Sequence, residues 1–129
     1  SMKPLTHEWI AKAEGDFRTA SREWRARKEP NYDALCFHVQ QGVEKYLKAR
    51  PQEADVPFGK THNLSVLLDL LLSCEPTWED IRTDLLVLTQ FAVAVRYPGE
   101  AADKETAREA MRVCRALRKK LRESLSLNV

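Results

Sequence analysis

The segment ALCFHVQQGVEKYLKA, Ala34–Ala49, carries the clearest fold signal in the sequence. Its apolar residues recur at steps of three and four, which is the period of an α-helix and not that of a strand. On a helical wheel they form one broad arc: Leu35, Cys36, Val39, Gly42, Val43, Tyr46 and Leu47. We therefore expect a helix over about Tyr32–Ala49, with this arc in a hydrophobic core.

The opposite side of the same helix is polar with one exception. It carries Phe37, Gln41, Glu44, Lys45 and Lys48. A phenylalanine is unexpected among solvated side chains, so we expect this second face to contact another chain.

Working outward, four further segments have helical spacing. The first predicted helix is Thr6–Arg27, with Thr6 as its N-cap, and the next begins after an N-cap at Thr61. The last two are Trp78–Val95 and Asp103–Leu125. Loops that contain proline separate the predicted helices. The Trp78–Val95 helix is apolar on two sides, with Ile81 and Leu85 on one and Phe91 on the other, which indicates burial against a second subunit. The fold class is all-α: an up-and-down bundle of four to five helices in one domain, residues 3–126.

Composition excludes several classes of protein. The 129 residues have a formal net charge of +2, which is too mild to identify a nucleic-acid-binding protein. The longest apolar stretch, residues 64–72, is much shorter than the roughly 20 residues of a membrane span. Cys36, Cys74 and Cys114 lie far apart among apolar residues. We expect reduced, mostly buried thiols, no metal site, no cofactor, no membrane association and a cytoplasmic location.

Four phrases in order resemble one known family. They are WIAKAEGDFRTA (residues 9–20), the phrase at 34–49, THNLSVLL (61–68) and RYP (96–98). Together they resemble the HEPN domains, which are small helical proteins found alone or beside a nucleotidyltransferase. The resemblance implies a helical bundle that forms a homodimer with a polar cleft between its subunits. It also implies a nucleotidyltransferase partner, in an arrangement like that of a toxin and its antitoxin.

Many HEPN proteins are ribonucleases with an arginine followed, after four to six residues, by a histidine. Counting from Arg96, that histidine would fall at Ala101, Ala102 or Asp103. Neither alanine transfers a proton, and a carboxylate does not reproduce the near-neutral titration of an imidazole. We therefore predict no catalytic residue and lean against an enzyme. The alternative is a metal-independent ribonuclease whose site combines Arg96 with His38 or His62.

The predicted function is binding of a nucleotide, RNA or another phosphate-bearing ligand in the cleft. Arg96 is expected to contact phosphate and Tyr97 to pack or stack. His38, Gln41 and Lys45 are expected to line the cleft, with Asp16 orienting one of the cations. Each residue also has a structural interpretation: Arg96 as a helix cap, His38 as the donor of one hydrogen bond, and Lys45 as a solvated lysine. A protein-interaction module without a ligand is the third possibility.

The last predicted helix carries a row of basic residues on one side. The row consists of Arg108, Arg112, Arg115, Lys119 and Arg122. Such a row is able to follow a phosphate backbone, but the helix lacks aromatic residues that would stack on bases. Pairing with nearby acids such as Glu105 and Glu109 is the alternative, and the sequence slightly favours it.

Overall fold

The computed structural model describes residues 1–94 and 97–127. Within these ranges the chain forms five α-helices and one 3-10 helix, and no strand. In chain order they are α1 (Pro4–Arg25), α2 (Tyr32–Glu53), α3 (Leu64–Leu71), η1 (Pro76–Ile81), α4 (Arg82–Ala94) and α5 (Lys104–Ser124). The prediction of an all-α bundle is confirmed.

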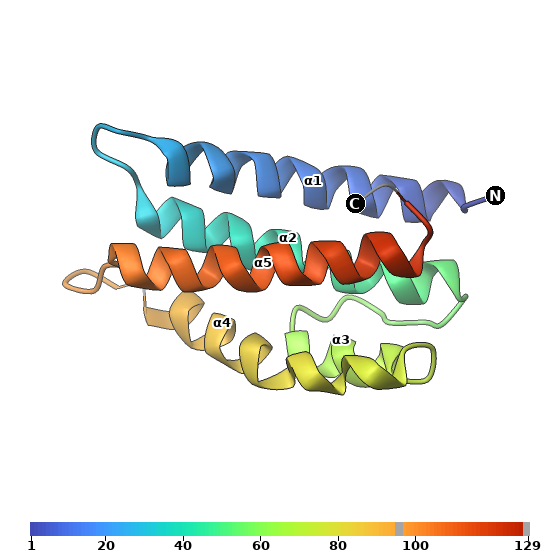
Figure 1. Cartoon of the computed structure of the whole chain (residues 1–129). Coiled ribbons are helices and arrows are strands. Elements are labelled where there is room, and N and C mark those ends of the chain that lie inside the picture. The colour runs from blue at the N-terminus through green and yellow to red at the C-terminus, as the bar shows by residue number, and fades with distance from the viewer. Residues whose placement is uncertain (95–96, 128–129) are drawn as a thin grey trace.

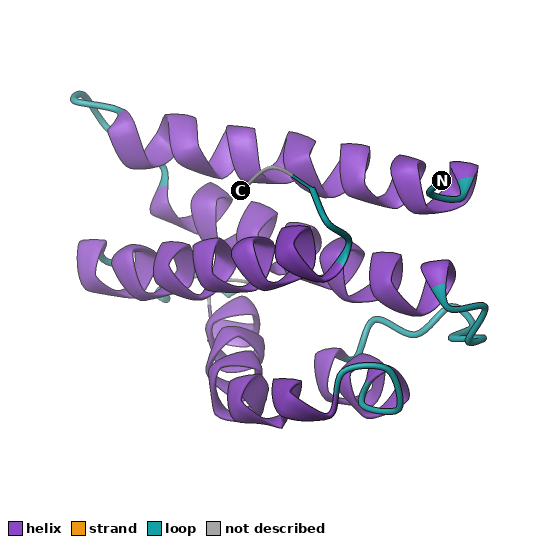
Figure 2. Cartoon of the chain, turned by 45° about the vertical axis from the view of Figure 1, so that its right-hand side comes forward, coloured by secondary structure: helices purple, strands orange, loops and turns teal. Residues whose placement is uncertain are grey.

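The three longest helices, α1, α2 and α5, lie side by side, and the shorter helices α3 and α4 occupy the far side of α2 (Figures 1 and 2). α1 and α2 are antiparallel, because Thr6 near the start of α1 bonds Glu53 at the end of α2. α5 runs parallel to α2: Asp33 bonds the backbone of Ala102 at one end, and Arg50 bonds Ser124 at the other.

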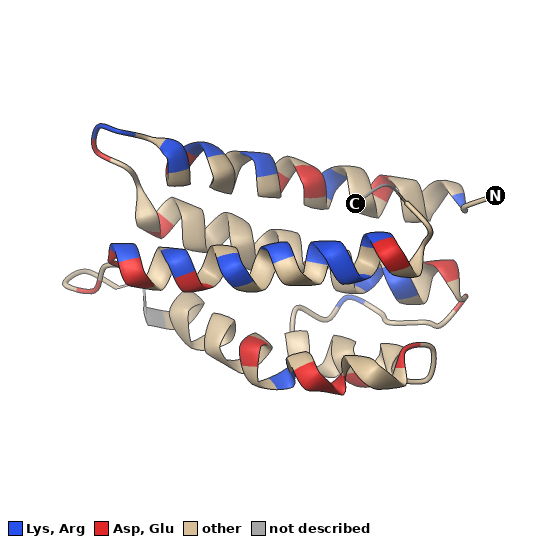
Figure 3. Ribbon diagram, viewed as in Figure 1, with Lys and Arg blue, Asp and Glu red and all other residues tan. Residues whose placement is uncertain are grey.

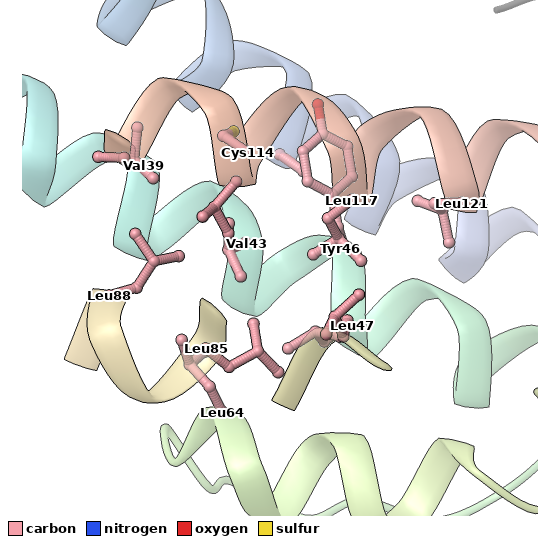
Figure 4. Close-up of a cluster of buried hydrophobic side chains, with 14 of the residues drawn as sticks. Val39, Val43, Tyr46, Leu47, Leu64, Leu85, Leu88, Cys114, Leu117 and Leu121 are labelled. Carbon is pink, nitrogen blue, oxygen red and sulfur yellow. The ribbon is translucent and has the colours of Figure 1, made fainter. Parts of the chain in front are cut away.

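The core lies between α2 and its neighbours (Figure 4). All seven apolar residues of the predicted arc on α2 are buried. Leu64 of α3, Leu85 and Leu88 of α4, and Cys114, Leu117 and Leu121 of α5 close around them. The expected thiol state is confirmed: all three cysteines are free, with Cys36 and Cys114 buried and Cys74 partly exposed.

The predicted start of the first helix is wrong. α1 begins at Pro4, with Lys3 at the N-cap position, and Thr6 is fully buried inside it. Proline suits the first helical position because its φ is already helical and its missing N–H would be unpaired there. The Thr6 hydroxyl caps nothing and instead donates to Glu53 Oε1 at 2.9 Å.

α2 continues past its predicted end at Ala49 and includes Pro51. A proline removes one backbone hydrogen bond and normally ends a helix at the residue before it. Here the last turn is anchored to α1, since Trp9 Nε1 donates to Gln52 Oε1 at 3.3 Å and Glu53 accepts from Lys3 and Thr6. These contacts between helices outweigh the local preference.

Two boundaries in the middle of the chain also differ from prediction. The N-cap of α3 is Asn63 and not Thr61: Asn63 Oδ1 accepts from the Val66 N–H, and Thr61 Oγ1 accepts from the Asn63 N–H. The segment predicted as the start of the fourth helix is the separate 3-10 turn η1, and α4 begins only at Arg82. The predicted end at Val95 lies outside the described residues.

No helix in the described part of the chain combines the length and the apolar character needed to cross a bilayer.

Candidate functional site

A close contact between α1 and α2 forms the base of the candidate site. A Cβ atom at Gly42 would lie 3.3 Å from Asp16 Cβ and 3.4 Å from the Ala13 carbonyl oxygen. Because glycine has no side chain, the two helices approach closely there. Asp16 therefore lies against α2, and its carboxylate contacts His38 and Lys45, which are about one turn before and after Gly42.

Asp16 joins two of the predicted ligand-binding residues. Its Oδ1 lies 2.9 Å from His38 Nδ1, and its Oδ2 accepts from Lys45 Nζ at 2.5 Å. We call Asp16, His38 and Lys45 the Asp16 cluster. Asp16 is largely buried, with 12% of its side chain exposed, whereas His38 and Lys45 remain more accessible. The prediction that Asp16 orients a nearby cation agrees with this geometry.

Phe37 connects the Asp16 cluster to a cavity. Its ring packs edge-on against His38, with 5.3 Å between the centroids. On its other side it lines a hollow of about 390 Å³ between α2 and α4, together with Asn31, Asp33, Ala34, Gln40, Gln41 and Ala92. Phe37 is 55% exposed, so the unusual phenylalanine of the polar face does not enter this chain's own core.

One residue of the cavity wall carries a buried polar atom without a partner. Gln40 Oε1 is buried and has no hydrogen-bond partner among the described residues. A buried carbonyl oxygen without a donor costs free energy, on the order of 1–3 kcal/mol. Gln40 and Gln41 both line the cavity, but the unpaired Gln40 Oε1 atom is itself buried behind the cavity wall.

Two of the predicted residues, Arg96 and Tyr97, follow α4 in the sequence. Arg96 lies outside the described residues. Tyr97 is described: it is 62% exposed, it is not among the residues that line the cavity, and its carbonyl oxygen accepts from the Glu100 N–H. Of the six predicted ligand-binding residues, the structure brings Asp16, His38 and Lys45 into contact, and Gln41 lines the neighbouring cavity.

Sequence analysis missed a second ionic cluster on the same helix. It treated Glu44 and Lys48 as exposed polar residues, but both are buried, and Lys48 is only 4% exposed. Lys48 Nζ donates to Glu44 Oε2 at 3.2 Å and lies 5.3 Å from the centre of a Trp9 ring. His62 Nδ1 lies 3.1 Å from both Glu44 oxygens. The missed signal is the i,i+4 pairing of opposite charges beside Trp9.

A third cluster is structural. Glu14 accepts from Tyr46 Oη at 2.5 Å, from Arg118 Nε at 2.7 Å and from Arg122 Nη1 at 2.7 Å, so it ties α1 to α2 and α5. Burial raises the pKa of Glu14, but hydrogen bonds from Arg118 and Tyr46 outweigh burial and hold it below 4.5. Burial, followed by the bond to Glu14, raises the pKa of Tyr46.

The basic row on α5 is mostly paired with acids. Arg108 pairs with Glu105, Arg112 with Glu109 and Asp84, Lys119 with Glu123, and Arg122 with Glu14. This pairing confirms the interpretation that the sequence slightly favoured. Arg115 is the exception in the row, since no acidic partner contacts it within the described part of the chain.

These features define a class: a small all-α bundle with a candidate polar site on the accessible face of its second helix. The family model of the HEPN domain matches residues 6–124. The chain therefore belongs to the HEPN domain family, and the family assignment made from the four sequence phrases is confirmed. No curated protein and no solved structure is significantly similar to it.

Proposed function

We propose that the protein is a homodimeric HEPN accessory protein that binds a nucleotide or another phosphate-bearing ligand between two subunits. The observation that carries the proposal is the placement of the Asp16 cluster beside the cavity between α2 and α4. Asp16 holds His38 and Lys45 at 2.9 and 2.5 Å on the accessible side of α2, and the ring of Phe37, which packs against His38, also lines the cavity.

Each group in this region has a role in the proposed complex. Lys45 is already paired with Asp16, so its charge is largely compensated, and we assign the main phosphate contact to Arg96. Lys45 and His38 add donors whose positions Asp16 fixes. Phe37 offers an apolar ring to a base, and the amides of Gln40 and Gln41 offer hydrogen bonds to the edge of that base.

Exposed apolar side chains support the proposed dimer. Phe37 of α2 is 55% exposed, and Leu86 and Val93 of α4 are about half exposed. Leu86 and Val93 are seven residues apart, so they lie on one side of α4. The predicted second apolar row of this helix needs one correction: Phe91 is partly buried and packs against the core of its own chain. The dimer contact is therefore assigned to Phe37, Leu86 and Val93.

Thermal denaturation with candidate ligands tests the binding proposal. The wild-type protein is melted with 1 mM ATP, ADP, AMP or pyrophosphate. A ligand present at 100 times its Kd stabilises the folded state by about 2.7 kcal/mol. We expect Arg96→Ala and Lys45→Ala to lose the shift. Lys60→Ala, which removes an exposed lysine from the loop between α2 and α3, is the matched control and should keep it. The absence of any shift with all four ligands would reject the proposal.

One contact favours a second candidate function, the ribonuclease. A carboxylate only accepts hydrogen bonds, so the bond to Asp16 makes His38 Nδ1 the donor and leaves Nε2 to accept a proton. An imidazole oriented by an aspartate is an arrangement suited to general-base chemistry. This candidate requires cleavage of RNA in EDTA, lost in both His38→Ala and Arg96→Ala. RNA that remains intact after long incubation removes it.

The proposed partner is a nucleotidyltransferase, as the sequence resemblance implies, in a pair that acts as toxin and antitoxin. Co-expression with a nucleotidyltransferase encoded next to the gene, followed by size-exclusion chromatography, tests this part. If the two chains elute together and no nucleotide changes the melting temperature, the protein is an interaction module without a ligand.

A further inference from the structure

Two antiparallel helices, α1 and α5, share a surface that the proposed function does not use. Arg108 of α5 lies over the ring of Trp24, and Arg118 lies over the ring of Phe17. Trp24 and Arg108 mark one end of the contact, and Glu14 and Arg122 mark the other. Arg115 lies between these two ends along α5.

Three further arginines extend this surface on α1. Arg18, Arg22 and Arg25 are exposed, and none has an ion-pair or hydrogen-bond partner within the described ranges 1–94 and 97–127. Arg18 and Arg25 follow Glu14 at steps of four and seven, so they lie on the side of α1 that faces α5. We call Arg18, Arg22, Arg25 and Arg115 the arginine surface.

Acidic residues occur on several elements of the fold. Asp69, Glu75, Glu79, Asp80 and Asp84 belong to the segment from α3 to α4, whereas the acids of α5 and Glu14 of α1 are paired with basic residues of α5. Figure 3 shows many basic positions along α1 and α5, with acidic positions among them and in the α3–α4 part of the chain.

We propose that the arginine surface binds the phosphate backbone of nucleic acid without reading its sequence. Guanidinium groups match phosphate geometry, and the span from Arg18 to Arg25 is about 10 Å along the helix. The neighbouring rings of Trp24 and Phe17 are covered by Arg108 and Arg118, so they are not open platforms for base stacking. This surface is separate from the Asp16 cluster and does not depend on the proposed nucleotide site.

The same observations argue against a membrane as the partner. Binding to a bilayer normally combines basic residues with apolar side chains that enter the interface. The large exposed apolar residues among those described are Leu5, Phe37, Val66, Leu86, Val93 and Tyr97. Trp24 and Phe17, the large rings between the arginines, are partly buried and packed against the core.

Salt-dependent binding of a labelled RNA tests the proposal. Fluorescence anisotropy with a fluorescein-labelled 20-nucleotide single-stranded RNA is measured between 50 and 200 mM KCl. Each phosphate contact contributes about 0.7 to the slope of log K against log salt concentration. Arg22→Gln/Arg25→Gln should therefore lower the slope by about 1.4 and weaken binding about tenfold at the higher salt. Arg18→Gln/Arg115→Gln should do the same.

The matched control is Lys12→Gln/Lys60→Gln, which removes the same charge from two exposed lysines outside the arginine surface. It should change affinity less than threefold. Melting temperatures of all variants check that the helices remain folded, because Arg22 and Arg25 also lie in the last turn of α1. The nucleotide-dependent thermal shift should be unchanged in the arginine variants, which separates this proposal from the function of the cleft.

Three outcomes would overturn the proposal. The first is RNA that does not bind even at 50 mM KCl. The second is a lysine control that loses as much affinity as the arginine variants, which would reveal a general charge effect. The third is binding to vesicles containing 20% phosphatidylserine, lost in the arginine variants, with no binding to RNA; that result would identify an anionic membrane as the partner.

Discussion

Gly42 on α2 lies directly against Asp16 on α1, where a Cβ atom at position 42 would come within 3.3 Å of Asp16 Cβ. This close approach places the Asp16 carboxylate between His38 and Lys45. Helix packing and the candidate site are therefore set by one contact, and a change that separates the two helices should weaken both.

Replacing glycine by alanine at two helical positions tests this contact. Alanine in place of glycine inside a helix normally stabilises it by about 0.8–1 kcal/mol. At Gly15, where the nearest atom is the end of the Arg18 side chain at 3.9 Å, we expect that gain. At Gly42 the new methyl group presses on α1 backbone, so Gly42→Ala should be less stable than Gly15→Ala by about 1 kcal/mol or more. Urea denaturation measures the free energy of unfolding of both variants. Equal values would show that α1 shifts to accommodate the methyl group at position 42 without loss of stability.

The cluster formed by Glu14, Tyr46, Arg118 and Arg122 predicts a dependence of stability on pH. The folded pKa of Glu14 lies below its ordinary value of 4.5, so its contribution is complete above about pH 4.5 and is lost as the pH falls through the folded pKa. Glu14→Gln leaves Arg118 and Arg122 without their carboxylate and should cost about 3 kcal/mol at pH 7. Urea denaturation of both proteins from pH 7 to pH 3 should show this difference shrinking. A constant difference would contradict the assignment.

The buried pair Glu44 and Lys48 predicts non-additive substitutions. Lys48→Met keeps the aliphatic packing against Trp9 but leaves Glu44 with His62 alone, and should destabilise the fold by about 2–4 kcal/mol. Adding Glu44→Leu removes the buried carboxylate, so the double variant should be more stable than Lys48→Met. A double-mutant cycle by chemical denaturation measures the coupling. Additive effects would mean that the two groups act independently.

Thiol reactivity should separate the three cysteines. Burial raises the pKa of Cys36 to about 11 and that of Cys114 to about 12, so both are protonated and inaccessible in the native protein. Cys74 is partly exposed at the end of α3. With a disulfide reagent such as DTNB we expect one fast thiol in native protein and three in 6 M guanidinium. If Cys74→Ser loses the fast phase, the fast thiol is Cys74. If the variant keeps the fast phase, the fast thiol is another cysteine.

The dimer has its own prediction. Phe37→Glu and Val93→Glu place a charge on the exposed apolar residues and should convert a dimer of 14.8 kDa chains to monomers at micromolar concentration. Val66→Glu is the control, since Val66 is also exposed but lies on α3. Sedimentation equilibrium measures the mass of each protein in solution. A wild-type protein that is already monomeric would reject the proposed dimer.

Much of the fold follows from local pattern. The burial of every residue in the apolar arc of α2, the N-cap at Asp103 and the separation into helical segments all follow from spacing and composition, because helical period and capping act within a few residues. The HEPN assignment also followed from the sequence, since the four phrases occur in order along most of the chain.

The positions where prediction failed depend on contacts between distant residues. Local rules end α2 before Pro51, but Gln52 and Glu53 are held by Trp9 and Thr6, more than forty residues earlier. Local rules also place Lys48 in solvent, whereas Trp9 and Glu44 bury it. The sequence pattern predicted Asp16, His38 and Lys45 as site residues, but it did not specify which cation Asp16 contacts. The bond to both His38 and Lys45 was decided by the tertiary structure, because it requires α1 and α2 to meet at Gly42.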